Sequence, residues 1–226
     1  MAMRTSFTKQ LSDLEALVGR FGEACCSDVR AAGLACAGDK GAEAGVLAGR
    51  KTAERLRSEI EGACLDTMLL QQPIIGGDLR FVTSTFRIVS DMAHIDSMAR
   101  DVAFILSELP EGVEGKLSDA FMAMSARAAA MIEGAVAAFL AADEAHAREV
   151  IAADDELDRM YAEAQDGVVG LIRAGDPPAR VLPELLMVAK YFERIGDNAQ
   201  RIANWAVFRA SGERILDGGV RVHDMS

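Results

Sequence analysis

The feature that most constrains the fold of this 226-residue chain is an internal duplication. The segment that starts at Arg80 aligns without a gap on the segment that starts at Arg180, and Ile95 and Ile195 fall in the same register. Upstream, AGDKGAEAGVLAGRKTAERL aligns on AADEAHAREVIAADDELDRM, and Leu11-Ser12-Asp13 aligns on Leu117-Ser118-Asp119. Because the segments keep the same order in both halves, the chain is predicted to consist of two copies of one structural unit.

Each copy carries the pattern of three helices. Apolar residues recur at spacings of three and four, which is typical of helices packed on one face. Half of the residues are apolar but only 5% are aromatic, a composition that favours close-packed helices. The predicted helices cover about residues 7–29, 46–68, 78–106, 121–139, 150–172 and 181–208. The sequence thus predicts an all-α fold of two tandem, pseudo-symmetric three-helix bundles.

Breaks in the pattern give the boundaries of the two units. Gln71-Gln72-Pro73, Leu109-Pro110-Glu111-Gly112 and Gly175-Asp176-Pro177-Pro178 are predicted to end helices, and Asp78 is predicted to cap the third one. We therefore expect a first unit over 1–110, a second over 111–212, and a flexible tail over 213–226, which lacks periodicity.

The charge of the chain narrows its possible partners. The net charge is −11 and the pI is near 4.8, whereas binding to nucleic acid requires clustered lysine and arginine. No nucleic-acid partner is therefore expected. The first residues are amphipathic and charged, and no uninterrupted apolar run reaches the ~20 residues that span a bilayer. These features predict a cytoplasmic protein that reaches a membrane only through partners.

The four cysteines show no metal or redox motif. Cys25, Cys26, Cys36 and Cys64 form no CxxC pair and have no histidine at zinc-finger spacing. They are predicted to be small core residues.

Carboxylates at helical spacing mark the most informative part of the chain. Glu193 and Asp197 are four residues apart on one face of the last predicted helix, and Asp155 and Asp158 are three apart on the preceding one. If the two helices pack side by side, four carboxylates converge, and such oxygen-rich groups bind hard or borderline cations.

Spacing alone leaves a second interpretation open. Both acidic runs are also compatible with solvated helix faces, with Glu193 and Asp197 paired to Arg194 and Arg201. In that case the protein is a metal-free helical scaffold whose acidic face docks basic partners. A further candidate is the pair Asp91 and His94, an Asp-x-x-His that binds metal less often than it packs between helices.

Several segments together resemble the PhoU family, in the wording of its actinobacterial members. They are FERIGDNAQRIA, DDELDRMY, LQQPIIGGDLR and, at the start, MRTSFTKQLSDLEAL, so the likeness spans most of the chain. The resemblance implies a cytoplasmic homodimer that represses the phosphate-starvation response and modulates phosphate transport. It also implies two partners, a sensor histidine kinase and the ATPase of the phosphate transporter.

The resemblance further implies a metal site in the second copy only. Family members hold cations on Glu/Asp-x-x-x-Asp of the third helix with acids of the second, and carried over this makes Glu193, Asp197, Asp155 and Asp158 the candidate ligands of iron, zinc or magnesium. The first copy departs from the pattern, because Ala93 and Ser97 stand at the positions of Glu193 and Asp197, and Arg50 and Lys51 stand at those of Asp154 and Asp155. Two cations in place of two acids repel a metal ion.

No pattern in the chain indicates catalysis. It contains no G-x-S-x-G, no phosphate-binding loop and none of the Glu-x-x-His motifs of di-iron bundles. We therefore predict a regulator and not an enzyme, with a carboxylate-bridged metalloenzyme as the least favoured alternative.

Overall fold

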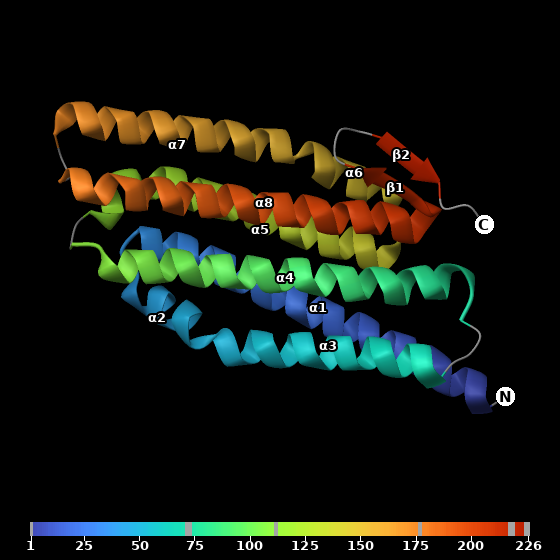
Figure 1. Cartoon of the computed structure of the whole chain (residues 1–226). Coiled ribbons are helices and arrows are strands. Elements are labelled where there is room, and N and C mark those ends of the chain that lie inside the picture. The colour runs from blue at the N-terminus through green and yellow to red at the C-terminus, as the bar shows by residue number, and fades with distance from the viewer. Residues whose placement is uncertain (1, 71–73, 111–112, 176–177, 217–219, 224–226) are drawn as a thin grey trace.

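The computed structural model describes residues 2–70, 74–110, 113–175, 178–216 and 220–223. In these residues the chain forms eight α-helices, two short 3-10 helices and one two-stranded hairpin (Figure 1). The first half contains α1 (Ala2–Cys36), α2 (Lys40–Ala48), α3 (Arg50–Leu70) and α4 (Gly76–Glu108). The second contains η1 (Glu114–Leu117), α5 (Ser118–Ala141), α6 (Glu144–Ala152), α7 (Asp154–Ala174), η2 (Ala179–Val181) and α8 (Leu182–Ser211). The predicted all-α fold is confirmed.

The second helix of each half is interrupted, which the sequence analysis did not predict. The break falls at Gly49 between α2 and α3 and at Ala153 between α6 and α7, at equivalent positions of the two copies. Both residues keep right-handed helical angles, so the chain kinks without leaving a loop. The apolar pattern crosses the kink unchanged, because Val46 and Ala53 are both buried, and it therefore could not reveal the break.

Matching caps support the duplication. Asp39 accepts hydrogen bonds from the backbone nitrogens of Gly41 (2.9 Å) and Ala42 (3.0 Å) at the start of α2. Its counterpart Asp143 accepts one from His146 (3.0 Å) at the start of α6. These bonds satisfy backbone donors that the first turn of a helix leaves unpaired.

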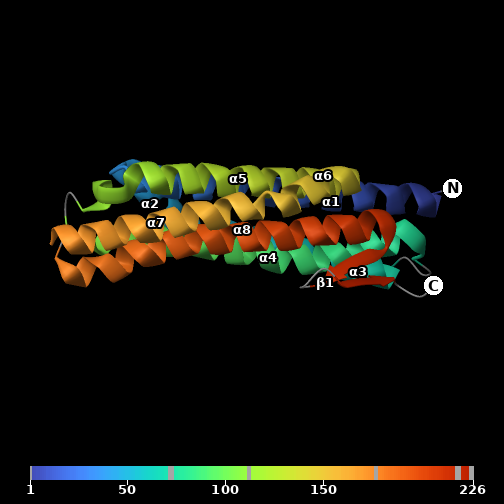
Figure 2. The same ribbon diagram turned by 90° about the horizontal axis from the view of Figure 1, so that it is seen from above.

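The helices lie along one long axis in layers (Figures 1 and 2). The long helices α1, α4, α5 and α8 pack on one another in the middle, while α2 and α3 flank this group on one side and α6 and α7 on the other. The two three-helix bundles therefore meet through the first and third helix of each and share one core.

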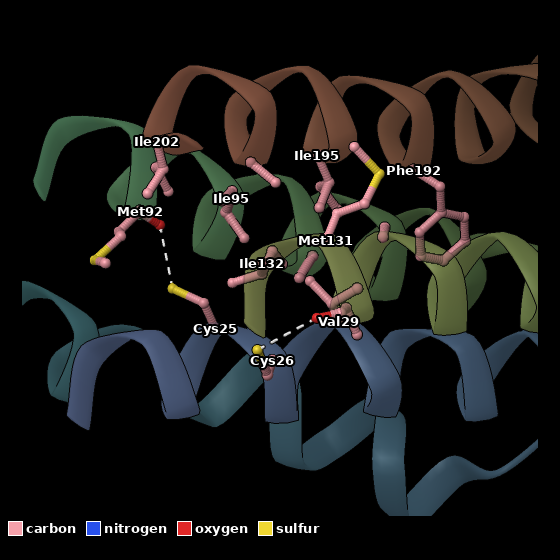
Figure 3. Packing of buried hydrophobic residues seen from close by; sticks show 14 of the residues in the cluster. Cys25, Cys26, Val29, Met92, Ile95, Met131, Ile132, Phe192, Ile195 and Ile202 are labelled. Atoms are coloured by element: carbon pink, nitrogen blue, oxygen red, sulfur yellow. Dashed lines mark hydrogen bonds between the residues drawn. The ribbon is translucent and has the colours of Figure 1, made fainter. Parts of the chain in front are cut away.

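The core consists of aliphatic, methionine and phenylalanine side chains. Figure 3 shows Ile95, Ile132, Ile195 and Phe192 directed toward one another from α4, α5 and α8. The four cysteines are free and buried, as predicted. Cys25 donates a hydrogen bond to the Met92 carbonyl at 3.4 Å (Figure 3), and burial raises the pKa of its thiol well above its usual value.

Arg209 joins the four long helices near one end of the molecule. Its guanidinium lies 4.0 Å from the ring centroid of Phe81 on α4 and donates to the carbonyl of Phe139 on α5 at 2.7 Å. It also pairs with Glu15 of α1 at 2.8 Å. A largely buried arginine with these contacts contributes cation–π and charge-assisted interactions at once.

Two expectations differ from the structure. The residue that caps α4 is Ile75, without a side-chain bond, and Asp78 instead lies in the first turn. The segment predicted to be a flexible tail contains the antiparallel hairpin of β1 (Glu213–Leu216) and β2 (Val220–His223). The breaks predicted at 109–112 and 175–178 are confirmed where they are described, because α4 ends before Leu109 and α7 ends before Gly175. Residues 71–73, 111–112 and 176–177 of the predicted breaks lie outside the described residues.

Within the described residues, one stretch, Gly115–Ala141, is long and apolar enough by length and composition to cross a membrane. It is interrupted by Lys116, Asp119, Arg127 and Glu133, so it is not the uninterrupted apolar run that the sequence analysis found to be lacking. The core helix of a globular bundle meets the same criterion, and 56% of the apolar 18-residue segment within this stretch is buried inside the protein. It corresponds largely to α5, whose apolar residues pack against α1 and α8.

Candidate functional site

The acidic residues singled out in the sequence lie where α7 packs against α8. We call Asp154, Asp155 and Asp158 of α7, together with Glu193 and Asp197 of α8, the acidic cluster. The close approach of the two helices depends on Gly196. A Cβ at that position would lie 2.3 Å from Leu157 Cδ2 and 3.4 Å from Asp154 Oδ1, so only glycine leaves room for both side chains.

Asp154 is the innermost member of the acidic cluster. Its side chain is buried, and its Oδ2 accepts a hydrogen bond of 2.8 Å from Gln200 Nε2 on α8. The pKa of this carboxyl is raised to about 6, first by burial and then, in decreasing order, by the negative charges of Asp197, Asp158, Glu193 and Asp155. The shift shows that the five carboxylates share one electrostatic environment.

Glu193 and Asp197 contribute the α8 side of the cluster. Glu193 Oε1 accepts a 2.5 Å hydrogen bond from Lys190 Nζ, whereas its Oε2 is buried and has no hydrogen-bond partner among the described residues. The pKa of Asp197 is raised, first by burial and then by Glu193. Lys190 is thus the nearest compensating cation, and it leaves an excess of negative charge.

The acidic cluster offers the kind of ligand atoms that a hard cation prefers. Carboxylate oxygens are the preferred ligands of such ions, and an unpartnered, buried carboxylate oxygen is an acceptor available to one. As the side chains lie, however, no three metal-ligating groups of the described residues are gathered closely enough to hold an ion. The residues fit a cation by charge and chemistry, and coordination requires them to reorient.

The structure shows which of the α7 acids faces α8. Asp155 and Asp158 are exposed, whereas Asp154, which the prediction did not include among the ligands, points into the contact with α8. The signal was present in the sequence, because Asp154 precedes the buried Leu157 by three residues and so shares its inward face.

The alternative pairing of the α8 acids with arginines is not observed. Arg201 donates to Asp91 of α4 at 3.0 Å, and Arg194 is exposed. Asp91 is thus paired with Arg201, while His94 remains close enough to favour the ionised form of Asp91 and also lines a cavity in the first half.

That cavity occupies the place of the acidic cluster in the first copy. It lies between α3 and α4, and Arg50, Ala93 and Ser97 line it, as the repeat alignment places them. The structure therefore brings the equivalent positions together in both halves, with acids in one and an arginine and small residues in the other.

Three kinds of comparison relate the chain to known proteins. The family model described as the PhoU domain matches residues 121–206, within the second half. A protein of Mycobacterium tuberculosis, named phosphate-specific transport system accessory protein PhoU homolog 1, is 25% identical over 220 residues, covering 93% of this chain and 95% of its own. A PhoU homolog of Caulobacter vibrioides is 28% identical over 214 residues, covering 93% and 92%.

Solved structures of the same name share the fold. The crystal structure of PhoU from Pseudomonas aeruginosa superposes with a TM-score of 0.84 at 24% identity, over 91% of this chain and 99% of that one. The phosphate transport system regulatory protein PhoU from Streptococcus pneumoniae gives a TM-score of 0.83 at 22% identity, over 93% and 99%. The similarity therefore includes both three-helix units.

Proposed function

We propose that the chain is a member of the PhoU family and acts as a regulatory accessory protein of phosphate transport. The observation that carries the proposal is the extent of the similarity, since relatives named as accessory proteins of the phosphate-specific transport system match the chain over 93% of its length. No catalytic constellation was found in the sequence, so we propose regulation through binding and not an enzymatic activity.

In more detail, we propose a cytoplasmic adaptor that represses the phosphate-starvation response. Its partners would be a sensor histidine kinase and the ATPase of the phosphate transporter, so that the chain meets the membrane only through them. The four-helix core and its flanking layers form an elongated body with long faces on which two partners could dock (Figure 1). A homodimer is part of the same proposal, and a net charge of −11 speaks against nucleic acid as a partner.

Capture from cell extracts tests the adaptor proposal. The immobilised full chain, incubated with lysates of phosphate-starved and phosphate-replete cells, is expected to retain the transporter ATPase and the sensor kinase. An unrelated helical protein of similar net charge is the control for ion-exchange effects. Retention of neither partner in either condition contradicts the adaptor proposal.

We also propose that the acidic cluster binds one cation or cation cluster, in the second half only. Glu193 and Asp197 would hold it from α8, and Asp154 with Asp158 and Asp155 from α7. A bound iron, zinc or magnesium ion would neutralise the excess negative charge and lock α7 to α8. Asp154 joins the predicted ligands because it lies deepest in the contact.

Elemental analysis after gentle purification tests the cation proposal. We expect metal bound stoichiometrically by the native chain and lost from the double variant Glu193→Gln with Asp197→Asn, while its helical circular dichroism is unchanged. The matched control carries Glu163→Gln with Asp166→Asn, two exposed acids farther along α7. Equal metal content in both double variants contradicts the assignment.

The second candidate is a metal-free scaffold with an acidic docking face. Its support is the Lys190 contact, because a lysine already bonded to Glu193 lowers the need for a cation. Absence of metal from the native chain, together with capture of partners, is the outcome that selects this candidate.

A further inference from the structure

The first half holds a cavity at the position that the acidic cluster occupies in the second. It has a volume of about 410 Å³ and lies between α3 and α4. Three arginines line it, Arg50 and Arg57 from α3 and Arg100 from α4, together with His94 and Ser97. A cavity of this size falls within the range of small-molecule sites.

The two halves differ in charge at equivalent positions. In the second half the five positions of the acidic cluster carry five carboxylates, a formal charge of −5. Their equivalents are Arg50, Lys51, Glu54, Ala93 and Ser97, and two cations with one anion give a formal charge of +1. The loss of the two α8-type carboxylates also opens the space, since alanine and serine are shorter than glutamate and aspartate. The equivalent positions have therefore lost most of their carboxylates and gained arginine donors, although the cavity itself is lined by three arginines and three acids, Glu54, Asp96 and Asp101.

The arginines of α3 retain donors for a ligand. Arg50 bonds to Glu54 and Arg57 to Glu61, each at 2.8 Å and each through Nε. Among the hydrogen bonds of the described residues, the terminal Nη groups of both are not used. A guanidinium presents five donors in a planar fork that matches the oxygens of a phosphoryl group.

The floor of the cavity is close to electrically neutral. Asp96 is buried and pairs with Arg100 one turn along α4. Asp28 of α1 lies beside Asp96, and the pKa of Asp28 is raised to about 7, first by burial and then by the negative charge of Asp96. The ion pair of Asp96 with Arg100 has no net formal charge. Of the acids that line the cavity, Glu54 and Asp101 then oppose the α3 arginines.

We propose that this cavity binds a small phosphate-bearing anion, held by the guanidinium groups of Arg50 and Arg57 with Ser97 as a further donor. The shared chemistry is a phosphoryl dianion, and its source is either inorganic phosphate or a small phosphate monoester. The proposal requires neither of the partners proposed above, and it concerns the half of the molecule that lacks the acidic cluster.

Titration calorimetry of the full chain at low salt tests the proposal, with inorganic phosphate and adenosine monophosphate as separate probes. Saturable binding of phosphate identifies the free anion as sufficient, and binding of the monophosphate alone identifies an ester. The double variant Arg50→Gln with Arg57→Gln is expected to weaken binding at least tenfold, because it removes two charged donors.

The matched control is Arg55→Gln. Arg55 lies on α3 and pairs with Glu59 at 2.6 Å, but it does not line the cavity. Its replacement changes the net charge in the same direction and is expected to alter affinity less than twofold. The proposal is overturned if neither probe binds. It is also overturned if the loss of affinity per arginine removed is the same in the control as in the double variant. Because Arg50 and Arg57 are on the surface, each variant is expected to fold, and circular dichroism checks this.

Discussion

Replacing Asp154 by asparagine is expected to stabilise the metal-free protein at neutral pH. The substitution keeps the shape of the side chain and an oxygen that can accept the hydrogen bond from Gln200, but it removes the charge. The carboxyl has a pKa of about 6 in the folded chain against 3.8 for an ordinary aspartate, because it is buried among other acids. The folded state therefore disfavours the ionised carboxylate by roughly 3 kcal/mol.

Two favourable effects of the carboxylate reduce the expected gain. Asp154 is the first residue of α7, where a negative charge interacts with the helix dipole by about 0.3–1 kcal/mol. Its hydrogen bond from Gln200 is also charge-assisted, and an amide acceptor weakens it. The expected net stabilisation is about 1–2 kcal/mol at pH 7.5, or a rise in Tm of about 2–8 °C for a chain of this length.

The pH dependence identifies the cause. Because the folded-state pKa is raised, the carboxyl stays protonated to a higher pH in the folded chain than in the unfolded one. The wild type therefore loses stability as pH rises from about 4 through about 6, and the gap between variant and wild type opens over the same range. At pH 4 the carboxyl is largely neutral in the folded chain, so most of the gap has closed.

Urea unfolding in the presence of a chelator, at pH 4 and pH 7.5, measures this difference. Asp155→Asn is the control, since Asp155 lies in the same helical turn but is exposed, and it is expected to change stability by less than about 0.5 kcal/mol. If Asp154→Asn is no more stable than the wild type at pH 7.5, or if the gap is the same at pH 4, the electrostatic reasoning is refuted. With saturating cation the order should reverse, because only the wild type gains the full binding energy.

Three further predictions concern packing and burial. Gly196→Ala should destabilise the chain by about 1–3 kcal/mol in urea unfolding, because the new Cβ overlaps Leu157. The control Gly62→Ala, in an open part of α3, should be neutral or slightly stabilising. Equal effects of the two substitutions contradict the close contact between α7 and α8. Arg209→Leu should cost about 2–3 kcal/mol by removing contacts to three helices, and a change below about 0.5 kcal/mol contradicts that role. The four buried thiols should react with a thiol reagent only after denaturation, and rapid labelling of the native protein would disprove their placement in the core.

The fold could be predicted from the sequence because the internal duplication and the apolar periodicity both follow from the way the helices pack. Helix starts with a side-chain cap, such as Asp39 and Asp143, also follow a local rule. The kinks at Gly49 and Ala153 leave no such local signal in the sequence, because the backbone there stays near helical angles and the apolar faces continue across each kink. Backbone pairing of the hairpin after Glu213 likewise leaves no periodic signal in so short a segment.

Only part of the candidate site could be predicted from the sequence, because residue spacing does not show how two helices face each other. Spacing identified Glu193 and Asp197 as one face, and it places Asp154 on the face of Leu157, but it does not show that this face of α7 is the one that meets α8. That choice is made by the buried Leu157 and by the gap at Gly196, which together turn Asp154 toward α8. The partner of Glu193 is Lys190, three residues before it on the same helix face, and not one of the predicted arginines.

The measurement that tests the regulatory account most directly is the output of a phosphate-starvation promoter in cells that lack this chain. Under phosphate-replete conditions a negative regulator of the response predicts high promoter activity in its absence and low activity when the full chain is restored. Promoter activity that stays low without the chain, with phosphate uptake unchanged, contradicts the account.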